Sequence, residues 1–384
     1  MKQEQLSDAL NYLPDEMLEE TEHVRSVTRQ KRIWRKWMAA AACLVLVFCV
    51  NLLMIPQQFF KDGTKELPIL TVHRESGRDT GSFACVEAYD ASEIVNDNPW
   101  SEEAEISTLP VYRRQFIYDP DRDNYGYDFA KMEALLRDVA GRLGLDAEHL
   151  EVKERKGSYY FNAYLTAKDE GIEIEVGHNM TVDIEFKHKV SLPDQYRFTD
   201  HASYQEVAAA AVYLKEEYKE LIGMENPQIN ITGGDYNDNL QQSYDLEFYD
   251  GSGGIKNKIV NYNFNRIVFY TSGKKLWLIR LFCPDLSEMV GEYPIITTEE
   301  ATDCLLRGDY ISSVFYEVPG REYIKKTELV YKVEDYEEYY MPYYEFYVEV
   351  PQEEQENGLK TYGIYQVPAV EEKYISYKGK ANFN

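Results

Sequence analysis

The chain is poor in the residues that build metal centres and disulfide frameworks: it has five cysteines and six histidines among 384 residues. Cys43 and Cys49 fall inside an apolar segment, which leaves Cys85, Cys283 and Cys304. No Cys-x-x-Cys pair and no Cys/His spacing of a zinc module occurs among these three. The pattern therefore indicates neither a zinc site nor a disulfide framework. A single bridge from Cys283 to Cys304 and three buried thiols both stay open.

The motifs of the common catalytic sites are also missing. The sequence contains no GxSxG elbow, no HExxH helix and no phosphate-binding loop, and residues 251–254 have the composition of a hairpin turn. The paired carboxylates of a glycosidase cannot be singled out among so many acidic residues. We therefore expect a protein that is not an enzyme, with no catalytic residue and no cofactor.

Two acidic clusters have some features of metal sites. The first has the alternation of a calcium loop, but Gly126 comes two positions late and Ala130 stands where a bidentate glutamate is needed. An acidic turn before a helix capped by Asp128 fits better. Its alternating residues are Asp119, Asp121 and Asp123.

In the second cluster, strict strand alternation puts Asp183 and Glu185 on one face and His178 and His188 on the other. Such side chains diverge, so solvated strand residues are the better interpretation. We expect no metal at either place.

Basic charge is scarce beyond the first residues. Residues 1–37 are balanced, with seven basic and seven acidic side chains, so the remainder carries the whole net charge of −26. The field of such a surface repels nucleic acid and attracts cations or a basic partner. We expect no nucleic-acid binding.

One long apolar run is present, at residues 37–55, WMAAAACLVLVFCVNLLMI. Its length suits a helix across a hydrocarbon layer of about 30 Å. A basic collar from Arg25 to Lys36 precedes it, which places the N-terminus in the cytoplasm by the positive-inside rule. We expect a single-pass protein of the cell membrane with an extracellular C-terminal domain. A cleaved signal peptide and a buried core helix are the alternatives.

The segment before the collar has apolar residues at helical spacing, interrupted by Pro14. Two short helices would be marginal alone and would order against a partner. The functional interpretation is a peptide that docks its apolar face in a groove, and the alternative is a spacer. The candidate partner-binding residues here are Leu6, Leu10, Leu13, Met17 and Leu18.

Beyond the anchor, helical periodicity followed by strand-like alternation recurs three times. The third helix should start at Thr297, whose side chain and that of Glu300 form a capping box. The expected class is α+β: one N-terminal transmembrane helix followed by repeated helix-on-antiparallel-sheet units. The expected parts are a tail at 1–36, the membrane helix at 37–55, a loop-rich linker at 56–110, and units at 111–190, 191–290 and 291–384.

The tyrosine-rich strand MPYYEFYVEV has two distinct faces. Alternation directs Tyr344, Phe346 and Val348 to the core, together with Val350. Tyr343 and Tyr347 point the other way and are the candidate partner-contact residues of the exterior, because their rings combine apolar area with a hydroxyl.

The pattern ITTEEATDCLLRGDYISSV, then ELVYKV, YYMPYYEFYV and YQVPAV, at residues 292–376, resembles the C-terminal module of YycI/YycH-type and PepSY-like extracytoplasmic proteins. The first 56 residues resemble anti-sigma-factor-like membrane proteins of Gram-positive bacteria, without the zinc-binding His and Cys. These resemblances imply a non-catalytic exterior domain that regulates a signalling partner, a sensor kinase or a sigma factor.

Taken with the topology, these patterns predict a membrane-anchored regulatory or sensory protein with a protein partner at the membrane or in the cytoplasm. The alternative is an anchored envelope module that binds peptide or glycan. The residues do not specify the signal, the identity of the partner or the oligomeric state.

Overall fold

The computed structural model describes residues 66–73, 85–115, 128–155, 163–169, 171–199, 201–333 and 337–378. The chain divides into two compact units, 1–66 and 67–384, and all described residues except Glu66 belong to the second. The tail and the apolar run at 37–55 lie outside the described residues. Within the described ranges, no helix combines the length and the apolar character needed to cross a membrane.

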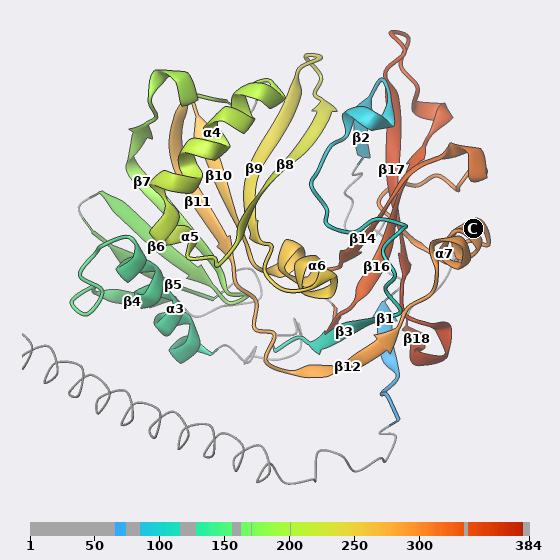
Figure 1. Ribbon diagram of the computed structural model, residues 1–384, viewed down its shortest axis with the longest axis horizontal. Coiled ribbons are helices and arrows are strands. Elements are labelled where there is room, and N and C mark those ends of the chain that lie inside the picture. Colours follow the sequence, from blue (N-terminus) through green and yellow to red (C-terminus); the bar gives the residue numbers. More distant parts are fainter. Residues whose placement is uncertain are drawn as a thin grey trace, which may run out of the picture. The chain divides into compact units, whose positions relative to one another are not determined.

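The expected α+β class with a transmembrane helix is wrong: the structure is mostly β and does not show that helix. Its helices are short and are interspersed among many strands (Figure 1). The error has a physical cause, because several paired strands follow the helices of each unit, so strand residues far outnumber helical ones.

The largest element is an antiparallel sheet of eight strands in the order β4-β5-β6-β7-β11-β10-β9-β8. It is made of two halves, each introduced by helices, and β7 pairs with β11 where the halves meet. The strands are β4 (Val152–Arg155), β5 (Tyr164–Lys168), β6 (Ile172–Gly177), β7 (Thr181–Ser191), β8 (Pro227–Tyr236), β9 (Gln242–Asp250), β10 (Arg266–Ser272) and β11 (Lys275–Phe282).

Helices α3 (Phe129–Arg142), α4 (Tyr204–Glu217) and α5 (Lys219–Ile222) pack on one face of this sheet. As expected, Asp128 caps α3 by accepting from the backbone N–H of Lys131 at 3.0 Å. Leu136 and Leu214 are fully buried against alternate strand residues such as Ile184. The helices therefore supply the apolar cover that the alternating strands need on one side.

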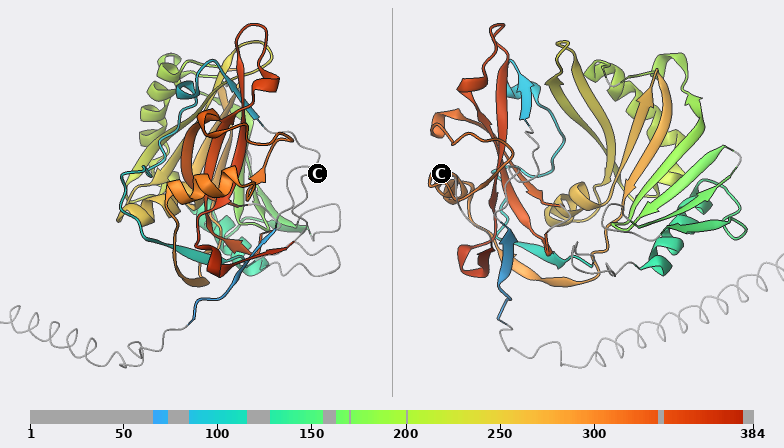
Figure 2. Two further views of the ribbon diagram at one scale, coloured as in Figure 1. Left: turned by 90° about the vertical axis from the view of Figure 1, so that its right-hand side faces the viewer. Right: turned by 180° about the vertical axis from the view of Figure 1, so that it is seen from behind.

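A second sheet has the order β13-β17-β16-β14, and β2 also pairs with β17. Helix α7 (Thr298–Leu306) covers the side of it that faces away from the first sheet (Figures 1 and 2). Its strands are β2 (Cys85–Ala88), β13 (Ile311–Ser312), β14 (Ile324–Tyr331), β16 (Pro342–Glu349) and β17 (Lys360–Pro368).

Two smaller sheets complete the domain. One has three strands in the order β12-β3-β15, from β12 (Met289–Pro294), β3 (Thr108–Arg113) and β15 (Tyr339–Tyr340). The other pairs β1 (Leu70–His73) in parallel with β18 (Ile375–Lys378). Residues expected to be a linker, 56–110, thus supply β1, β2 and the start of β3 where they are described. These pairings join residues far apart in sequence, so local pattern does not reveal them.

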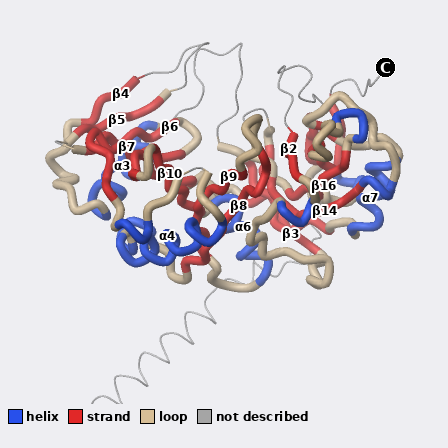
Figure 3. The backbone as a smooth tube through the Cα atoms, turned by 90° about the horizontal axis from the view of Figure 1, so that it is seen from above, coloured by secondary structure: helices blue, strands red, loops and turns tan. Residues whose placement is uncertain are grey.

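Helix α6 (Ile255–Phe264) lies between the two larger sheets (Figure 3). It was not expected, because the glycines at 251–254 suggested a hairpin turn; instead Gly254 forms the N-cap of this helix. The apolar residues Ile259, Val260 and Phe264 pack into the core of the second sheet. The expected units at 111–190 and 191–290 therefore share one sheet, and α6 links it to the third.

Candidate partner-binding groove beside strand β14

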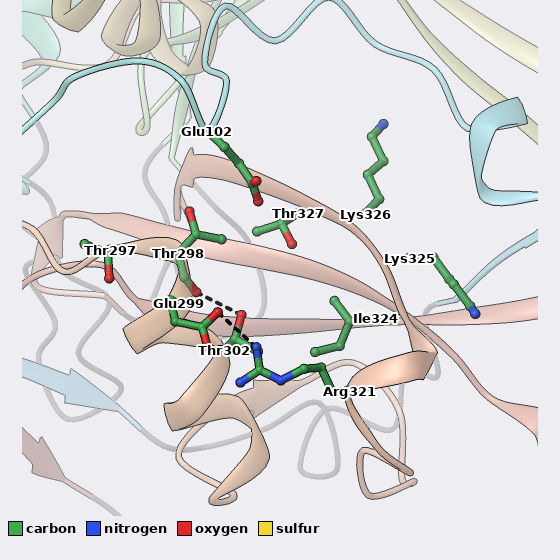
Figure 4. A pocket seen from close by; sticks show the side chains of 10 residues that line it. All are labelled: Glu102, Thr297, Thr298, Glu299, Thr302, Arg321, Ile324, Lys325, Lys326 and Thr327. Atoms are coloured by element: carbon green, nitrogen blue, oxygen red, sulfur yellow. Dashed lines mark hydrogen bonds and ion pairs between the residues drawn. The ribbon is translucent and has the colours of Figure 1, made fainter.

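A polar groove of about 600 Å³ lies where α7 faces the first half of β14 (Figure 4). Three sets of residues line it: the start of α7, the first residues of β14 with the preceding turn, and Glu102 from the segment before β3. They are Glu102, Thr297, Thr298, Glu299, Thr302, Arg321, Ile324, Lys325, Lys326 and Thr327.

The helical wall of the groove is fixed by the capping box expected from the sequence. The Thr297 hydroxyl accepts from the backbone N–H of Glu300 at 3.2 Å, and the Glu300 carboxylate accepts from the backbone N–H of Thr297 at 2.8 Å. These hydrogen bonds hold the pKa of Glu300 below its usual range. The backbone N–H groups of Thr297 and Glu300 at the start of α7 thus both have acceptors, which fixes this wall of the groove.

Hydroxyl and charged groups dominate the lining. Arg321 forms ion pairs with Glu299 at 2.9 Å and Asp303 at 2.9 Å, which tie the turn before β14 to α7. Glu102 points towards Thr298 and Thr327, whereas Lys325 and Lys326 point away from α7 (Figure 4). The arrangement can hydrogen-bond a polar or extended ligand, and it shows no nucleophile paired with a base.

A second polar region lies between the two larger sheets and encloses about 270 Å³. The Glu345 carboxylate accepts from the Gln366 side-chain amide at 2.8 Å. Burial raises the pKa of Glu345, and the nearby Glu328 carboxylate raises it further. The neighbouring Glu247 is paired with Arg266 at 3.0 Å. The Glu345–Gln366 contact lies within the second sheet and the Glu247–Arg266 pair within the first, so both sheets present polar side chains to this region.

The structure separates the predicted exterior contact residues. Tyr343 is fully buried and packs with the core that includes Tyr293 and Met341. Tyr347 is half-buried, and the Lys326 ammonium lies 5.3 Å from its ring centroid. Residues of β1, β3 and β12 cover Tyr343, and a small cluster at residues 88–94 packs against Tyr347, so a second layer covers that side of β16. The opposite face, Tyr344 to Val350, is core as expected. The predicted tail contacts Leu6, Leu10, Leu13, Met17 and Leu18 lie outside the described residues.

The second suspected metal cluster does not converge. Asp183 pairs with Arg280 at 2.6 Å, and His178 is buried. Within the described ranges no three His, Cys, Asp or Glu side chains are grouped closely enough to hold an ion. The calcium-like aspartates at 119–123 lie outside those ranges. Cys85, Cys283 and Cys304 are free thiols, so the bridge left open above is not formed.

Sequence reasoning missed the groove because its walls come from distant segments. Glu102 and Thr327 lie more than two hundred positions apart, and neither stands in a motif. The one available signal was the capping box at Thr297, which located the start of α7 but not what faces it.

No family model and no curated protein matches the chain. A solved structure, an uncharacterized protein from Eubacterium rectale, is similar over 69% of this chain and 84% of its own, with 14% identity and a TM-score of 0.33. That similarity is too low to support any inference about fold or activity.

Proposed function

We propose that this chain is a regulatory protein held at the cell membrane by residues 37–55, with a cytoplasmic N-terminus and an exterior domain that binds a protein partner. In this proposal it catalyses no reaction and acts on a signalling protein, a sigma factor or a sensor kinase. The observation that supports it is the polar groove beside β14, which offers binding groups along an open wall. The strongly acidic domain adds attraction for a basic partner.

Site-specific photo-crosslinking in native membranes tests the exterior part of this proposal. A photoreactive side chain at Lys325, in the groove, should give one protein adduct that is lost when unlabelled partner is added in excess. The matched control position is Val212, an exposed residue of α4. Equal adducts from both positions would contradict a groove-specific partner, and adducts with glycan alone would favour a module for envelope glycan.

The cytoplasmic part is tested in the tail. Leu10→Asp places a charge on the apolar face expected to dock, so it should abolish tail-dependent co-purification of the signalling protein and change its target transcripts. Leu10→Met keeps the face apolar and should behave as the native chain. If both variants and a deletion of residues 2–36 leave partners and transcripts unchanged, the tail is a spacer.

A further inference from the structure

Strand β14 forms one edge of the second sheet. It pairs with β16, and no other strand of the described residues pairs with its opposite side. Such an edge carries backbone N–H and C=O groups that point outwards and can pair with another chain. Which residues of β14 direct these groups outwards follows from the register.

The register places the backbone groups of Thr327 on the outer side. In the antiparallel pair, Thr327 lies opposite Phe346, two positions before Leu329 opposite Tyr344. The Leu329 carbonyl accepts from the Asn98 side chain at 3.3 Å, and so points away from β16. Because backbone direction alternates along a strand, Thr327 points the same way as Leu329.

A second contact agrees with this assignment. The backbone N–H of Tyr331, two positions beyond Leu329, donates outwards to the Asn263 side chain at 3.0 Å. On the other strand, the Pro342 carbonyl opposite Tyr331 accepts from Ala369, away from β14. Residues 327, 329 and 331 therefore share one outward direction.

The outer edge is occupied along only part of its length. Asn98 and Asn263 cap Leu329 and Tyr331, so the second half of β14 is closed by side chains. Thr327 lines the groove instead, and within the described residues its outward N–H and C=O have no hydrogen-bond partner. The N–H of Ile324 donates to the Arg321 carbonyl, so the open stretch from Lys325 to Thr327 is three residues, about 10 Å of strand.

The charges along this stretch favour a basic occupant. Lys326 is paired with Glu328 at 2.7 Å and Lys325 with Glu349 at 3.4 Å. Arg321 is likewise held by two acidic residues of α7. Among the described residues, Glu102 is the charged group of the lining that has no ion-pair partner.

We propose that an extended segment of the partner adds to β14 as a short strand, bonds to the backbone of Thr327, and places a lysine or arginine against Glu102. This inference rests on the proposed function and specifies how its partner binds. Strand addition uses main-chain hydrogen bonds for affinity and flanking side chains for specificity. The short open edge suits a segment of three or four residues.

The test uses the full chain in lipid nanodiscs and synthetic peptides selected on it from a displayed random library. Thr327→Pro removes the outward N–H and leaves the β14–β16 ladder bonds in place, since proline is tolerated where an edge N–H faces outwards. We expect peptide affinity to fall about tenfold or more, because a buried hydrogen-bond partner is lost. Thr327→Val keeps the N–H and the β-branched shape, and should bind within about twofold of the native chain.

The charge contact is tested by Glu102→Gln, with Glu103→Gln as the control in the same turn. Selected peptides should carry lysine or arginine and bind Glu102→Gln several-fold more weakly, while the control is unchanged. If Thr327→Pro does not fold, single backbone amides of the bound peptide are N-methylated instead. Methylation should abolish binding at every second peptide position, because only those amides point towards β14.

Three results would overturn the inference: no peptide is selected, Thr327→Pro binds peptide as the native chain does, or the effect of N-methylation on binding does not alternate along the peptide. Retention of the groove-specific protein adduct at Lys325 together with any of these would leave the proposed function standing and remove strand addition alone. Loss of that adduct as well would remove both.

Discussion

The Asn98 side-chain amide donates to the Leu329 carbonyl oxygen at 3.3 Å, across the outer edge of β14. Its own amide oxygen accepts from the backbone N–H of Trp100 at 3.0 Å, which holds the side chain in place. A side chain thus occupies the position that a further strand would take. It marks the point where the closed part of the edge ends and the groove begins.

Asn98→Asp isolates this cap, because aspartate keeps the acceptor for Trp100 and loses the donor for Leu329. We expect the free energy of unfolding to fall by about 1–3 kcal/mol, since the carbonyl is left beside a carboxylate with no donor. Urea denaturation followed by tryptophan fluorescence measures it. Asn239→Asp, in an exposed turn, is the control and should change stability little. A native-like value for Asn98→Asp would show that the cap contributes nothing.

The groove wall depends on the cap of α7. Thr297→Ala removes the hydroxyl that accepts from Glu300, so we expect a loss of about 1 kcal/mol. Thr297→Ser retains the acceptor and should be close to native. Thermal unfolding by circular dichroism compares the two, and equal melting temperatures for both variants would contradict a role for the box.

Lys332 and Glu337 form an ion pair at 2.7 Å in which each side chain is 4% exposed. Lys332→Met leaves the carboxylate buried without its cation, and should cost about 3–5 kcal/mol. The double variant Lys332→Met with Glu337→Gln removes both charges and should recover most of that loss. A denaturant double-mutant cycle measures the coupling; additive losses would show that the two charges are independent.

The pH dependence of stability should carry the signature of Glu345. Its folded pKa is raised above the ordinary 4.5, mainly by burial, so the folded state holds the proton more tightly than the unfolded chain does. The free energy of unfolding therefore loses this contribution as pH rises from about 4.5 through the folded pKa. Glu345→Gln stays neutral and should lose less stability across that window, as urea titrations between pH 4 and 8 can show. Parallel pH profiles for the two proteins would contradict it.

Local features were predictable where one short segment determines them. Asp128 and Thr297 cap helices as their side chains require, and the face of β16 from Tyr344 to Val350 is core because alternation and apolar type agree. Helix α6 was missed because the preceding glycines suggested a turn, although Val260 and Phe264 are one helical turn apart and form its buried face with Ile259.

Features that depend on a second layer were not predictable. Alternation correctly directs Tyr343 away from the face of Tyr344, but only the elements packed on that side decide that it is buried. The groove likewise requires Glu102, α7 and β14 to meet, and no local pattern encodes their meeting. Which backbone groups of β14 point outwards depends on its register with β16, which no local pattern determines.

The most direct measurement is hydrogen–deuterium exchange of single backbone amides in the full chain, with and without a selected basic peptide. Strand addition predicts that the outward amide of Thr327 exchanges more slowly on binding, while the amides of Lys326 and Glu328, which face β16, change little. Protection elsewhere with no change at Thr327 would contradict the account.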